Sequence, residues 1–305
     1  MHLLLAKPRG FCAGVVRAID TVKETIALFG PPVYVKHQIV HNAHVVKELE
    51  NMGAIFVEEL SEVPFGARVI YSAHGIPPSV RMEALKRGLI EIDATCGLVT
   101  KVHSAIKRFA KKGYKVILIG HKNHVEILGS AAQAPDAVTV VESIQDIATL
   151  PFSEKTPLAW LTQTTLSLYD VHELVEALRL RYPHIETLPS SSICYATTNR
   201  QMALKEIARQ VDIAIVVGDI KSSNSNRLRE VAERAGIPAW LVGNAEGMKR
   251  DWLKGVERIG MSAGASTPEE IVQGCVQQLY SWGLQSIEEV VLCEEEVFFQ
   301  LPKIV

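Results

Sequence analysis

Three of the five cysteines open segments of similar sequence. These segments are Cys12-Ala-Gly-Val-Val-Arg17, Cys96-Gly-Leu-Val-Thr-Lys101 and Cys194-Tyr-Ala-Thr-Thr-Asn199. Each carries a pair of β-branched residues at the third and fourth positions after the cysteine, and a basic or amide residue at the fifth. A helical pattern follows in each segment, so each thiol is expected at or near a helix N-terminus. That position favours the thiolate, which is the form that ligates metal.

Three thiolates without a Cys-x-x-Cys pair are compatible with either of two kinds of metal site. One is zinc with water as the fourth ligand, and the other is a 4Fe-4S cluster whose fourth iron has no protein ligand. Soft thiolates suit both, so the ligand type leaves the two open. Cys275 lies within an amphipathic pattern and Cys293 follows an apolar run. Both lack the repeated context, and free cysteines are often simply buried, so both are expected to be structural.

The repetition continues beyond the cysteines. His41 lies 29 residues after Cys12, and His124 lies 28 residues after Cys96. Ser222 lies 28 residues after Cys194. Each of the three follows a predicted strand. The next predicted strand of each third also ends in a polar loop, and these loops contain His74, Thr164 and Ser266.

These polar loops indicate an anionic ligand. The imidazoles could donate to an anion, as could Ser266 and the run 221–226, Lys-Ser-Ser-Asn-Ser-Asn. A helical pattern begins at about Asn226, so the N–H groups and hydroxyls before it could bind phosphate. The chain has neither a Gly-x-x-x-x-Gly-Lys-Ser/Thr loop nor a Gly-x-Gly-x-x-Gly motif, which argues against nucleoside triphosphates and dinucleotides. Taken singly, each residue fits an ordinary cap; their recurrence at equivalent places favours a site.

Glu126 is the one obvious carboxylic acid in these loops, two residues after His124. In a purely structural role it would complement a helix dipole from the first turn. In a catalytic role it would deliver protons during the reductive removal of a hydroxyl, with Thr164 and His124 completing a relay.

The elements that position these residues alternate between short strands and helices, which predicts an α/β fold. The clearest strands are Val33–Lys36, Val69–Ser72, Val116–Ile119, Leu158–Leu161, Ile213–Val217 and Ile259–Ser262. Clear helical patterns are Ala43–Met52, Val171–Leu180, Asn226–Ala235 and Pro268–Leu279. Runs without polar alternation are typical of parallel strands covered on both faces. We therefore expect three similar α/β units with mostly parallel sheets around a pseudo-threefold axis, with the metal at the centre and the ligand loops at the C-terminal ends of the strands.

The expected boundaries follow the cysteine repeats. The first unit spans residues 1–96, with residues 1–13 as candidates to complete the third, and the second spans 97–193. The third spans 194–285, and a C-terminal tail covers 286–305. The sequence leaves open whether this tail packs over the cavity or forms an oligomer contact.

The composition is that of an ordinary globular protein. The chain has 305 residues, 48% hydrophobic and 22% charged, with a net charge of −2. This balance and the absence of a basic–aromatic stripe argue against nucleic-acid binding. No apolar run approaches the roughly 18 residues of a membrane span, and the apolar start is too short for a signal peptide. We therefore expect a cytoplasmic protein whose cysteines are thiols or metal ligands rather than disulfides.

The motifs resemble those of the 4-hydroxy-3-methylbut-2-enyl diphosphate reductases. The N-terminal segment Ala6-Lys-Pro-Arg-Gly-Phe-Cys-Ala-Gly-Val15 is similar to the signature of that family. Further similar segments span nearly the whole chain; they are 38–42 (Gln-Ile-Val-His-Asn), 72–75 (Ser-Ala-His-Gly), 93–96 (Asp-Ala-Thr-Cys), 162–167 (Thr-Gln-Thr-Thr-Leu-Ser), 193–201 (Ile-Cys-Tyr-Ala-Thr-Thr-Asn-Arg-Gln), 222–226 (Ser-Ser-Asn-Ser-Asn) and 262–266 (Ser-Ala-Gly-Ala-Ser).

The resemblance implies the last step of the methylerythritol phosphate route to isoprenoids. Such enzymes reduce an allylic alcohol diphosphate by two electrons, release water and form isopentenyl and dimethylallyl diphosphates. It also implies one 4Fe-4S cluster on Cys12, Cys96 and Cys194, and electrons from a ferredoxin or flavodoxin. The implied substrate-binding residues are His41, His74, His124, Thr164, Ser222, Ser223, Asn224 and Ser266. The implied catalytic residues are Glu126, Thr164 and His124.

This chain departs from the family pattern at three positions. Gly97 and Val125 stand where proline is usual, and Val16 replaces an acidic residue. None removes a ligand or the acid, but the two missing prolines are expected to loosen their loops. The alternative to an enzyme is a three-thiolate protein that senses redox state or a phosphorylated metabolite. Glu126 favours the enzyme, because a sensor needs no proton donor.

Overall fold

The computed structural model describes residues 1–189 and 192–304. Residues 190–191, in the expected second unit, and residue 305, in the expected tail, lie outside this description. The chain divides into two compact units, each assembled from distant segments. Unit 1 comprises Met1–Val15, His41–Val45 and Tyr195–Phe298; unit 2 comprises Val16–Val40, Val46–Cys194 and Phe299–Val305.

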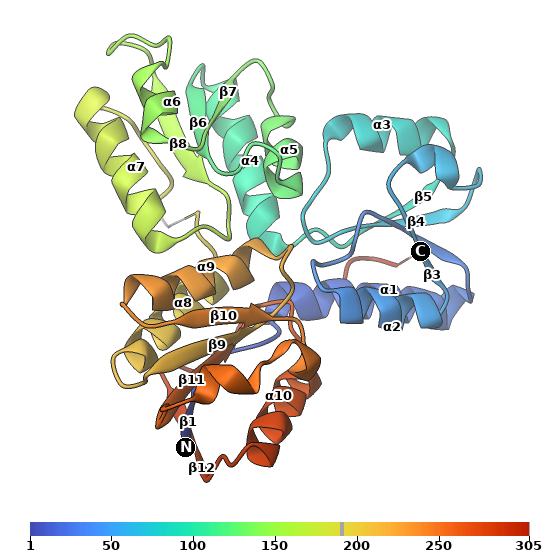
Figure 1. The fold of residues 1–305 in the computed structure, drawn as a ribbon. Helices are drawn as coiled ribbons and strands as arrows, with labels where there is room; N and C mark the ends of the chain where they lie inside the picture. Colours follow the sequence, from blue (N-terminus) through green and yellow to red (C-terminus); the bar gives the residue numbers. More distant parts are fainter. Residues whose placement is uncertain (190–191, 305) are drawn as a thin grey trace. The chain divides into compact units, whose positions relative to one another are not determined.

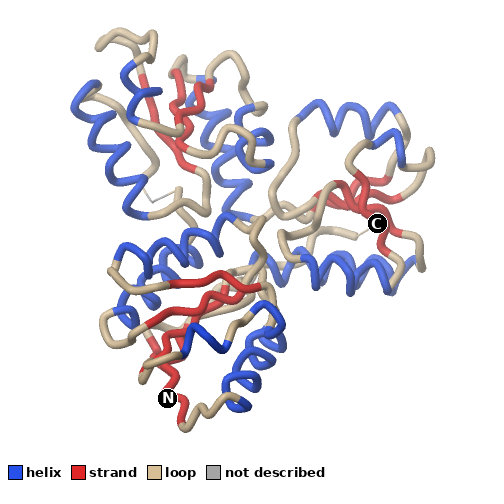
Figure 2. The backbone as a smooth tube through the Cα atoms, in the orientation of Figure 1, coloured by secondary structure: helices blue, strands red, loops and turns tan. Residues whose placement is uncertain are grey.

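Unit 1 contains a five-stranded parallel sheet (Figure 1). Its strands, in spatial order, are β10 (Ala239–Val242), β9 (Ile213–Val217), β11 (Arg258–Ala263), β1 (His2–Lys7) and β12 (Ser286–Val291). Its helices are α8 (Tyr195–Ala208), α9 (Ser223–Arg234) and α10 (Glu269–Ser281), with the 3-10 turns η2 (Ala245–Gly247) and η3 (Arg250–Leu253). Figure 2 shows the strands of this sheet lying between helices.

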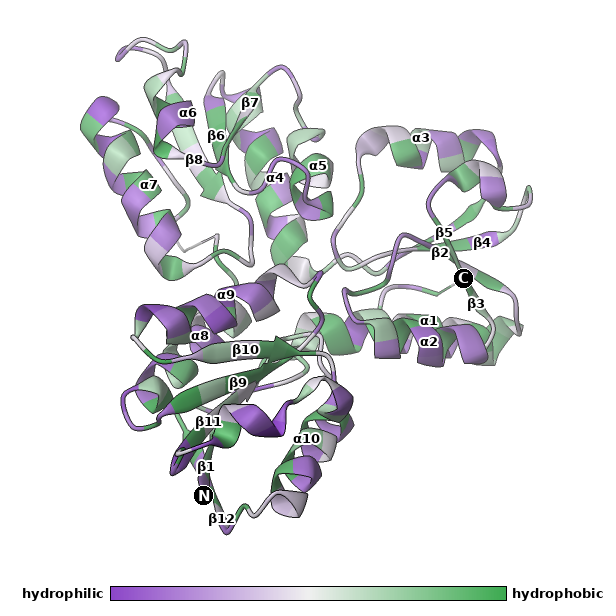
Figure 3. Cartoon of the chain, in the orientation of Figure 1, coloured by the Kyte–Doolittle hydropathy of each residue, from purple (hydrophilic) through white to green (hydrophobic). Residues whose placement is uncertain are grey.

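The inner strands of this sheet are buried on both faces, which explains their continuous apolar runs, whereas the edge strand β12 is largely exposed. Successive side chains of a strand point to opposite faces. Ile215 of β9 packs into a cluster with Val272 and Cys275 of α10. Its neighbour Val216 packs on the other face with Leu204 of α8. Figure 3 accordingly shows β9 and β10 as hydrophobic, while α10 carries alternating hydrophilic and hydrophobic residues.

Unit 2 contains two smaller parallel sheets. The four-stranded sheet has the order β3 (Ala54–Val57), β2 (Val33–Lys36), β4 (Arg68–Tyr71) and β5 (Ile90–Asp93). The three-stranded sheet has the order β7 (Val138–Val141), β6 (Lys115–Ile119) and β8 (Leu158–Thr162). The helices are α1 (Ala13–Phe29) and α2 (Ala43–Asn51), both of which begin in unit 1, and α3 (Pro78–Lys86), α4 (Gly97–Lys111), α5 (Val125–Ala131), α6 (Ile144–Ala148) and α7 (Leu168–Arg181), with the 3-10 turn η1 (Leu60–Glu62).

The three-stranded sheet repeats the packing of unit 1. Ile117 of β6 packs with Leu174 of α7. Leu118, the next residue, packs on the opposite face with Ile106 of α4. In Figure 1, α3 lies on one side of the four-stranded sheet and α1 on the other. All three sheets thus have helices on both faces, as apolar strands without polar alternation predict.

The expected α/β class with mostly parallel sheets is confirmed. The expected boundaries at residues 96, 193 and 285 stay a prediction. Two strand pairings bear on these boundaries. β1 pairs with β11, and β1 also pairs with β12, which is the first part of the expected tail. No helix in the described part of the chain is both long and apolar enough to span a bilayer.

One expected helix begins earlier than the sequence pattern indicates. The pattern places its start at about Asn226, but α9 starts at Ser223 with Ser222 as its N-cap. Serine and asparagine are poor residues for a helix interior, which hid the first turn from the pattern. The Ser222 side chain accepts a hydrogen bond from the Ser225 N–H and so makes this early start favourable.

Candidate functional site

In unit 2, the loop after β4 joins an imidazole to a thiol segment. His74 is half-buried, and its Nδ1 lies 3.2 Å from the Ser72 hydroxyl. The Ala73 carbonyl accepts a hydrogen bond of 3.0 Å from the Cys96 N–H. Cys96 is the N-cap residue of α4, as the sequence predicted for a thiol at a helix N-terminus. Gly97, the first expected departure from the pattern that the sequence resembles, is the first residue of that helix.

His124 caps the next helix of unit 2, α5. Its Nδ1 accepts a 3.2 Å hydrogen bond from the Glu126 N–H, so the proton of the neutral ring belongs on Nε2. The His124 ring lies edge-on to the His74 ring, with 6.2 Å between the centroids. The cap therefore orients one imidazole beside the other. Val125, the second position of departure, is the first residue of this helix.

Glu126 is a buried acid, only 3% exposed. Its carboxylate accepts two hydrogen bonds from Thr164, one from the N–H at 2.7 Å and one from the hydroxyl at 2.8 Å. Burial raises the pKa of Glu126 from 4.5 to about 7, although both hydrogen bonds act in the opposite direction. An acid that titrates near neutral pH can donate a proton under ordinary conditions.

Thr164 also links this acid to a thiol segment. Its carbonyl accepts a 2.9 Å hydrogen bond from the Cys194 N–H. Cys194 directly precedes α8. Unit 2 therefore brings two cysteine segments, two imidazoles and a buried carboxyl group into one set of loops at strand ends. These residues are Cys96, Cys194, His74, His124, Glu126 and Thr164.

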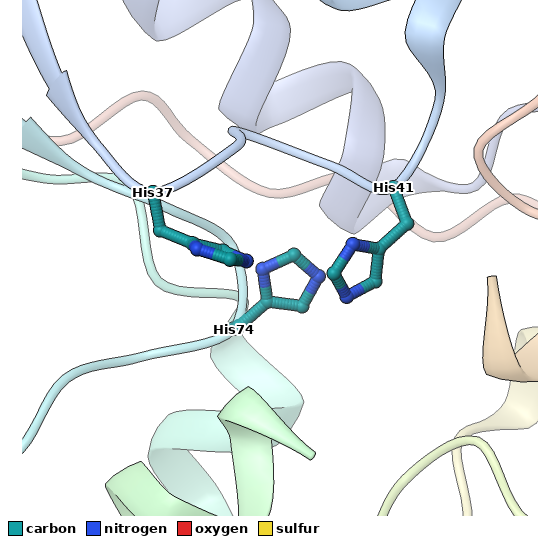
Figure 4. A group of neighbouring side chains, drawn as sticks. All are labelled: His37, His41 and His74. Atoms are coloured by element: carbon teal, nitrogen blue, oxygen red, sulfur yellow. The ribbon is translucent and has the colours of Figure 1, made fainter. Parts of the chain in front are cut away.

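The sequence reasoning missed His37. It follows β2 directly, as the His74 loop follows β4, and its ring lies edge-on to that of His74 with a centroid distance of 5.8 Å (Figure 4). Its Nδ1 lies 3.0 Å from the Glu58 carboxylate. Its backbone has φ of 62°, in the left-handed region that few residues other than glycine adopt. Its place at the end of a strand was the one available signal. His41, also drawn in Figure 4, belongs to unit 1.

Unit 1 holds the remaining cysteine of the repeat, and the loop after β11 fixes it. The Cys12 N–H donates to the Ala265 carbonyl at 3.2 Å, and the Gly10 N–H donates to the Ala263 carbonyl at 3.3 Å. Cys12 directly precedes α1. Ser266, in the same loop, donates from its hydroxyl to the His41 carbonyl at 2.9 Å.

Two further hydrogen bonds order the His41 segment, and the first of them ties it to a distant part of unit 1. The Ala43 N–H donates to the Asp219 carboxylate at 3.0 Å. The Asn42 side chain accepts from the His44 N–H at 3.0 Å and caps α2. The position of His41 thus depends on residues far away in the sequence.

The first turn of α9 carries a polar side chain without an internal partner. Asn224 is 4% exposed, and within the described part of the chain neither its amide oxygen nor its amide nitrogen has a hydrogen-bond partner. A buried polar group left unpaired costs free energy, so such a group calls for a partner from outside the chain. Ser222 and Ser223 stand beside it at the helix N-terminus, where N–H groups bind anions.

The Ser225 side chain packs closely against the loop after β11. Its hydroxyl oxygen lies where a Cβ at Gly218 or at Gly264 would stand, only 2.2 and 2.0 Å from those positions. Neither glycine could therefore carry a side chain. Unit 1 thus gathers the remaining candidate residues around one loop: Cys12, His41, Ser222, Ser223, Asn224 and Ser266.

The cysteines fit a thiolate metal site. All five lie in the described part of the chain and none forms a disulfide. Cys12, Cys96 and Cys194 are half-buried and each stands at the start of a helix. Cys275 is buried in the core of unit 1, where burial raises its pKa to about 12, as expected for a structural thiol. Cys293 is half-buried and lies just beyond β12.

Comparison with known proteins gives a consistent result over the full chain. Residues 3–280 match the family model described as LytB protein. A protein of Protochlamydia amoebophila named 4-hydroxy-3-methylbut-2-enyl diphosphate reductase is 60% identical over 303 residues, 99% of this chain and 97% of the relative. A protein of Chlamydia pneumoniae with the same name has the same identity and coverage.

Two solved structures are also similar. One is the E-1-hydroxy-2-methyl-but-2-enyl-4-diphosphate reductase from Plasmodium falciparum, with a TM-score of 0.94 and 47% identity, covering 98% of this chain and 95% of that one. The other is an (E)-4-hydroxy-3-methyl-but-2-enyl diphosphate reductase, with a TM-score of 0.67 and 33% identity, covering 92% and 99%. Both support the α/β fold described above.

Proposed function

The chain belongs to the LytB protein family, and on that premise we propose that it reduces 4-hydroxy-3-methylbut-2-enyl diphosphate to isopentenyl and dimethylallyl diphosphates. The membership that the sequence motifs indicate, in a family of oxidoreductases, is confirmed. In the proposed reaction the allylic hydroxyl leaves as water. Two electrons and two protons enter, one proton in the water and one on the carbon skeleton.

The observation that carries this proposal is the buried Glu126. Its pKa of about 7 keeps a proton available near neutral pH, and Thr164 holds its carboxyl group in place with two hydrogen bonds. A reductive dehydroxylation needs such a donor, because a hydroxyl leaves far more readily as water than as hydroxide. In this proposal Glu126 protonates the leaving hydroxyl, and the Thr164 hydroxyl and the His124 Nε2–H orient it.

The proposed cofactor is one 4Fe-4S cluster with Cys12, Cys96 and Cys194 as ligands. The set of three half-buried cysteines at helix starts, without disulfides, supports it. When bound, such a cluster supplies electrons and an iron with an open ligand position. The residues of the chain then bind the substrate and supply the proton.

The proposed diphosphate ligands divide into imidazoles and the loops of unit 1. His41, His74 and His124 donate from ring nitrogens. Ser222, Ser223 and Asn224 donate from hydroxyl, amide and helix N-terminal groups. The Ser266 hydroxyl, which donates to the His41 carbonyl in this structure, would redirect its one proton to the diphosphate. The unpaired amide of Asn224 supports this role, because a phosphate oxygen would give its nitrogen an acceptor.

We place the reaction in the cytoplasm and propose a ferredoxin or flavodoxin as the electron donor. The chain has no Gly-x-Gly-x-x-Gly fingerprint for a nicotinamide or flavin dinucleotide. Electrons would therefore come from a separate protein.

The test is anaerobic purification, analysis of iron and sulfide, and an assay with a chemical reductant and the allylic diphosphate. We expect a brown protein with about four irons and four sulfides per chain, and both five-carbon diphosphates as products. A colourless protein with stoichiometric zinc would overturn the redox function. A protein that binds the substrate but reduces it with no donor would instead support a sensor.

A further inference from the structure

The C-terminal residues 293–301 contact two of the cysteine segments. They follow β12, the edge strand that pairs with β1. Along residues 294–299, Glu295 and Phe299 are the partly buried side chains, whereas Glu294, Glu296, Val297 and Phe298 are exposed. Glu295 belongs to unit 1 and Phe299 to unit 2, so each contact is made within one unit.

In unit 1, Glu295 pairs with a fully buried arginine. Arg200 lies in α8, six residues after Cys194, and its side chain is 1% exposed. Its Nη1 donates to the Glu295 carboxylate at 3.1 Å, and the Asn199 amide donates to the same oxygen at 2.9 Å. The carboxylate is itself only 13% exposed, so it is the counter-charge that makes the buried guanidinium tolerable.

The guanidinium of Arg200 in turn holds the backbone before Cys12. Its Nε and Nη2 donate to the Gly10 carbonyl at 3.1 and 2.9 Å. Nη2 also lies 3.4 Å from the Phe11 carbonyl. Gly10 has φ of +64°, so this segment makes a turn that depends on such contacts. Glu295 therefore fixes the Cys12 segment through Arg200.

In unit 2, the next part of the tail contacts the Cys96 segment. A Cβ at Gly97 would lie 3.1 Å from the Phe299 ring, so the missing side chain leaves room for that ring against the start of α4. Arg17 donates to the Gln300 carbonyl at 2.8 Å and to the Thr95 carbonyl at 2.9 Å. The guanidinium of Arg17 thus donates hydrogen bonds both to the tail and to Thr95, the residue before Cys96.

These contacts account for a feature of the repeats that the proposed reaction does not use. The fifth residue after Cys12 is Arg17, and the fifth after Cys194 is Asn199. Both donate hydrogen bonds to the tail. We propose that residues 293–301 form a C-terminal strap that holds the Cys12 and Cys96 segments in the conformation that ligates metal. Arg17, Arg200, Glu295 and Phe299 are its positioning residues.

The strap proposal rests on the proposed function only in assuming that the held segments bind iron. Its first test therefore uses metal-free protein, in which the contacts of the strap can be measured without the cluster. We measure the rate at which iodoacetamide modifies each cysteine, by mass spectrometry of peptides. Glu295→Ala should raise the rate at Cys12 by at least about tenfold, because it removes the counter-charge of Arg200 and the hydrogen bonds that the Glu295 carboxylate accepts from Arg200 and Asn199. Phe299→Ala should raise the modification rate at Cys96 to a similar extent. This variant leaves no buried charge unpaired, so it still tests the strap if Glu295→Ala folds poorly.

Matched controls come from the neighbouring positions. Glu294 pairs with Lys7 at an exposed site and Phe298 is 79% exposed, so Glu294→Ala and Phe298→Ala should leave both rates near those of the parent. Phe299→Leu, which keeps an apolar side chain against Gly97, should restore the parent rate at Cys96. The rate at Cys275 should not change in any variant, whereas a general loss of stability would raise it.

The second test follows iron. After anaerobic reconstitution, Glu295→Ala and Phe299→Ala should release iron to a ferrous chelator faster than the parent and the two control variants. Parent-like alkylation and iron release in both variants would overturn the strap. If the parent takes up no iron, the proposed function fails, and the alkylation rates alone still decide whether the strap exists.

Discussion

At the scale of single residues, Glu126 ties the stability of the chain to its proposed chemistry. Its pKa in the folded chain is about 7, above the 4.5 of an exposed glutamate, because burial disfavours the charged form. Between these two pH values the folded chain holds more protons than the unfolded chain. The stability from this group is therefore present in full below pH 4.5 and is lost as the pH rises through about 7.

The first prediction follows from the same pKa. Turnover of the parent with a chemical reductant should fall as the pH rises through about 7, because Glu126 loses its proton there. Glu126→Gln keeps the shape and the hydrogen-bonding reach but has no acidic proton. It should lower turnover by about 10²–10⁴-fold and remove this pH dependence, with cluster content and substrate binding unchanged. A variant with parent-like turnover would exclude Glu126 and direct attention to His124 or Thr164.

The sequence suggested most of the candidate residues, whose roles stay predictions, but one neighbouring imidazole escaped it. Cys12, Cys96 and Cys194 could be found because their context repeats three times, and Glu126 because it is the one obvious carboxylic acid in the polar loops. His37 could not be found in this way. Its contact with His74 and its left-handed backbone are properties of the folded loop and have no counterpart in residue spacing.

At the scale of elements, the helix starts carry the chemistry. Cys96, His124 and Ser222 are all N-cap residues, so the helices α4, α5 and α9 each present their N–H groups beside a candidate ligand. The six strands predicted from apolar runs, such as Ile213–Val217, agree with β2, β4, β6, β8, β9 and β11 to within a residue at each end, whereas the other strands were not delimited. The start of α9 could not be predicted, because its first turn combines poor helix formers that are stabilised by a cap.

The second prediction separates the two roles in that first turn. Asn224 contributes no internal hydrogen bond, so Asn224→Ala should leave the melting temperature unchanged or higher. It should nevertheless weaken the binding of pyrophosphate about tenfold, as expected for one hydrogen bond to a charged group. Isothermal titration calorimetry and thermal unfolding measure the two quantities.

Ser222→Ala is the contrasting variant. It removes the cap that accepts the Ser225 N–H, so it should lower stability by about 1 kcal/mol as well as weaken pyrophosphate binding. Unchanged pyrophosphate affinity in both variants would exclude the first turn of α9 as the anion site.

At the scale of the whole molecule, local patterns predicted α/β units with parallel sheets and offered residues 1–13 as candidates to complete the third unit, but they did not predict the other contacts between distant segments. The Ala43 N–H bonds to the Asp219 carboxylate across 176 positions, and this contact helps to place residues 41–45 in unit 1. The pairing of β1 with both β11 and β12 likewise joins the two ends of the chain. Neither contact leaves a periodic signal, because each depends on one or two side chains or on backbone alone.

The last prediction uses this division of the chain. Cys12 belongs to unit 1, whereas Cys96 and Cys194 belong to unit 2. If one cluster takes all three thiolates, serine at any of these positions should remove most of the iron and sulfide and the associated absorption. Cys275→Ser and Cys293→Ser, which lie outside the repeated segments, should keep parent levels. Parent-like iron in Cys12→Ser, together with loss in Cys96→Ser and Cys194→Ser, would mean that unit 2 binds the metal without unit 1, and the three-thiolate site would then be wrong.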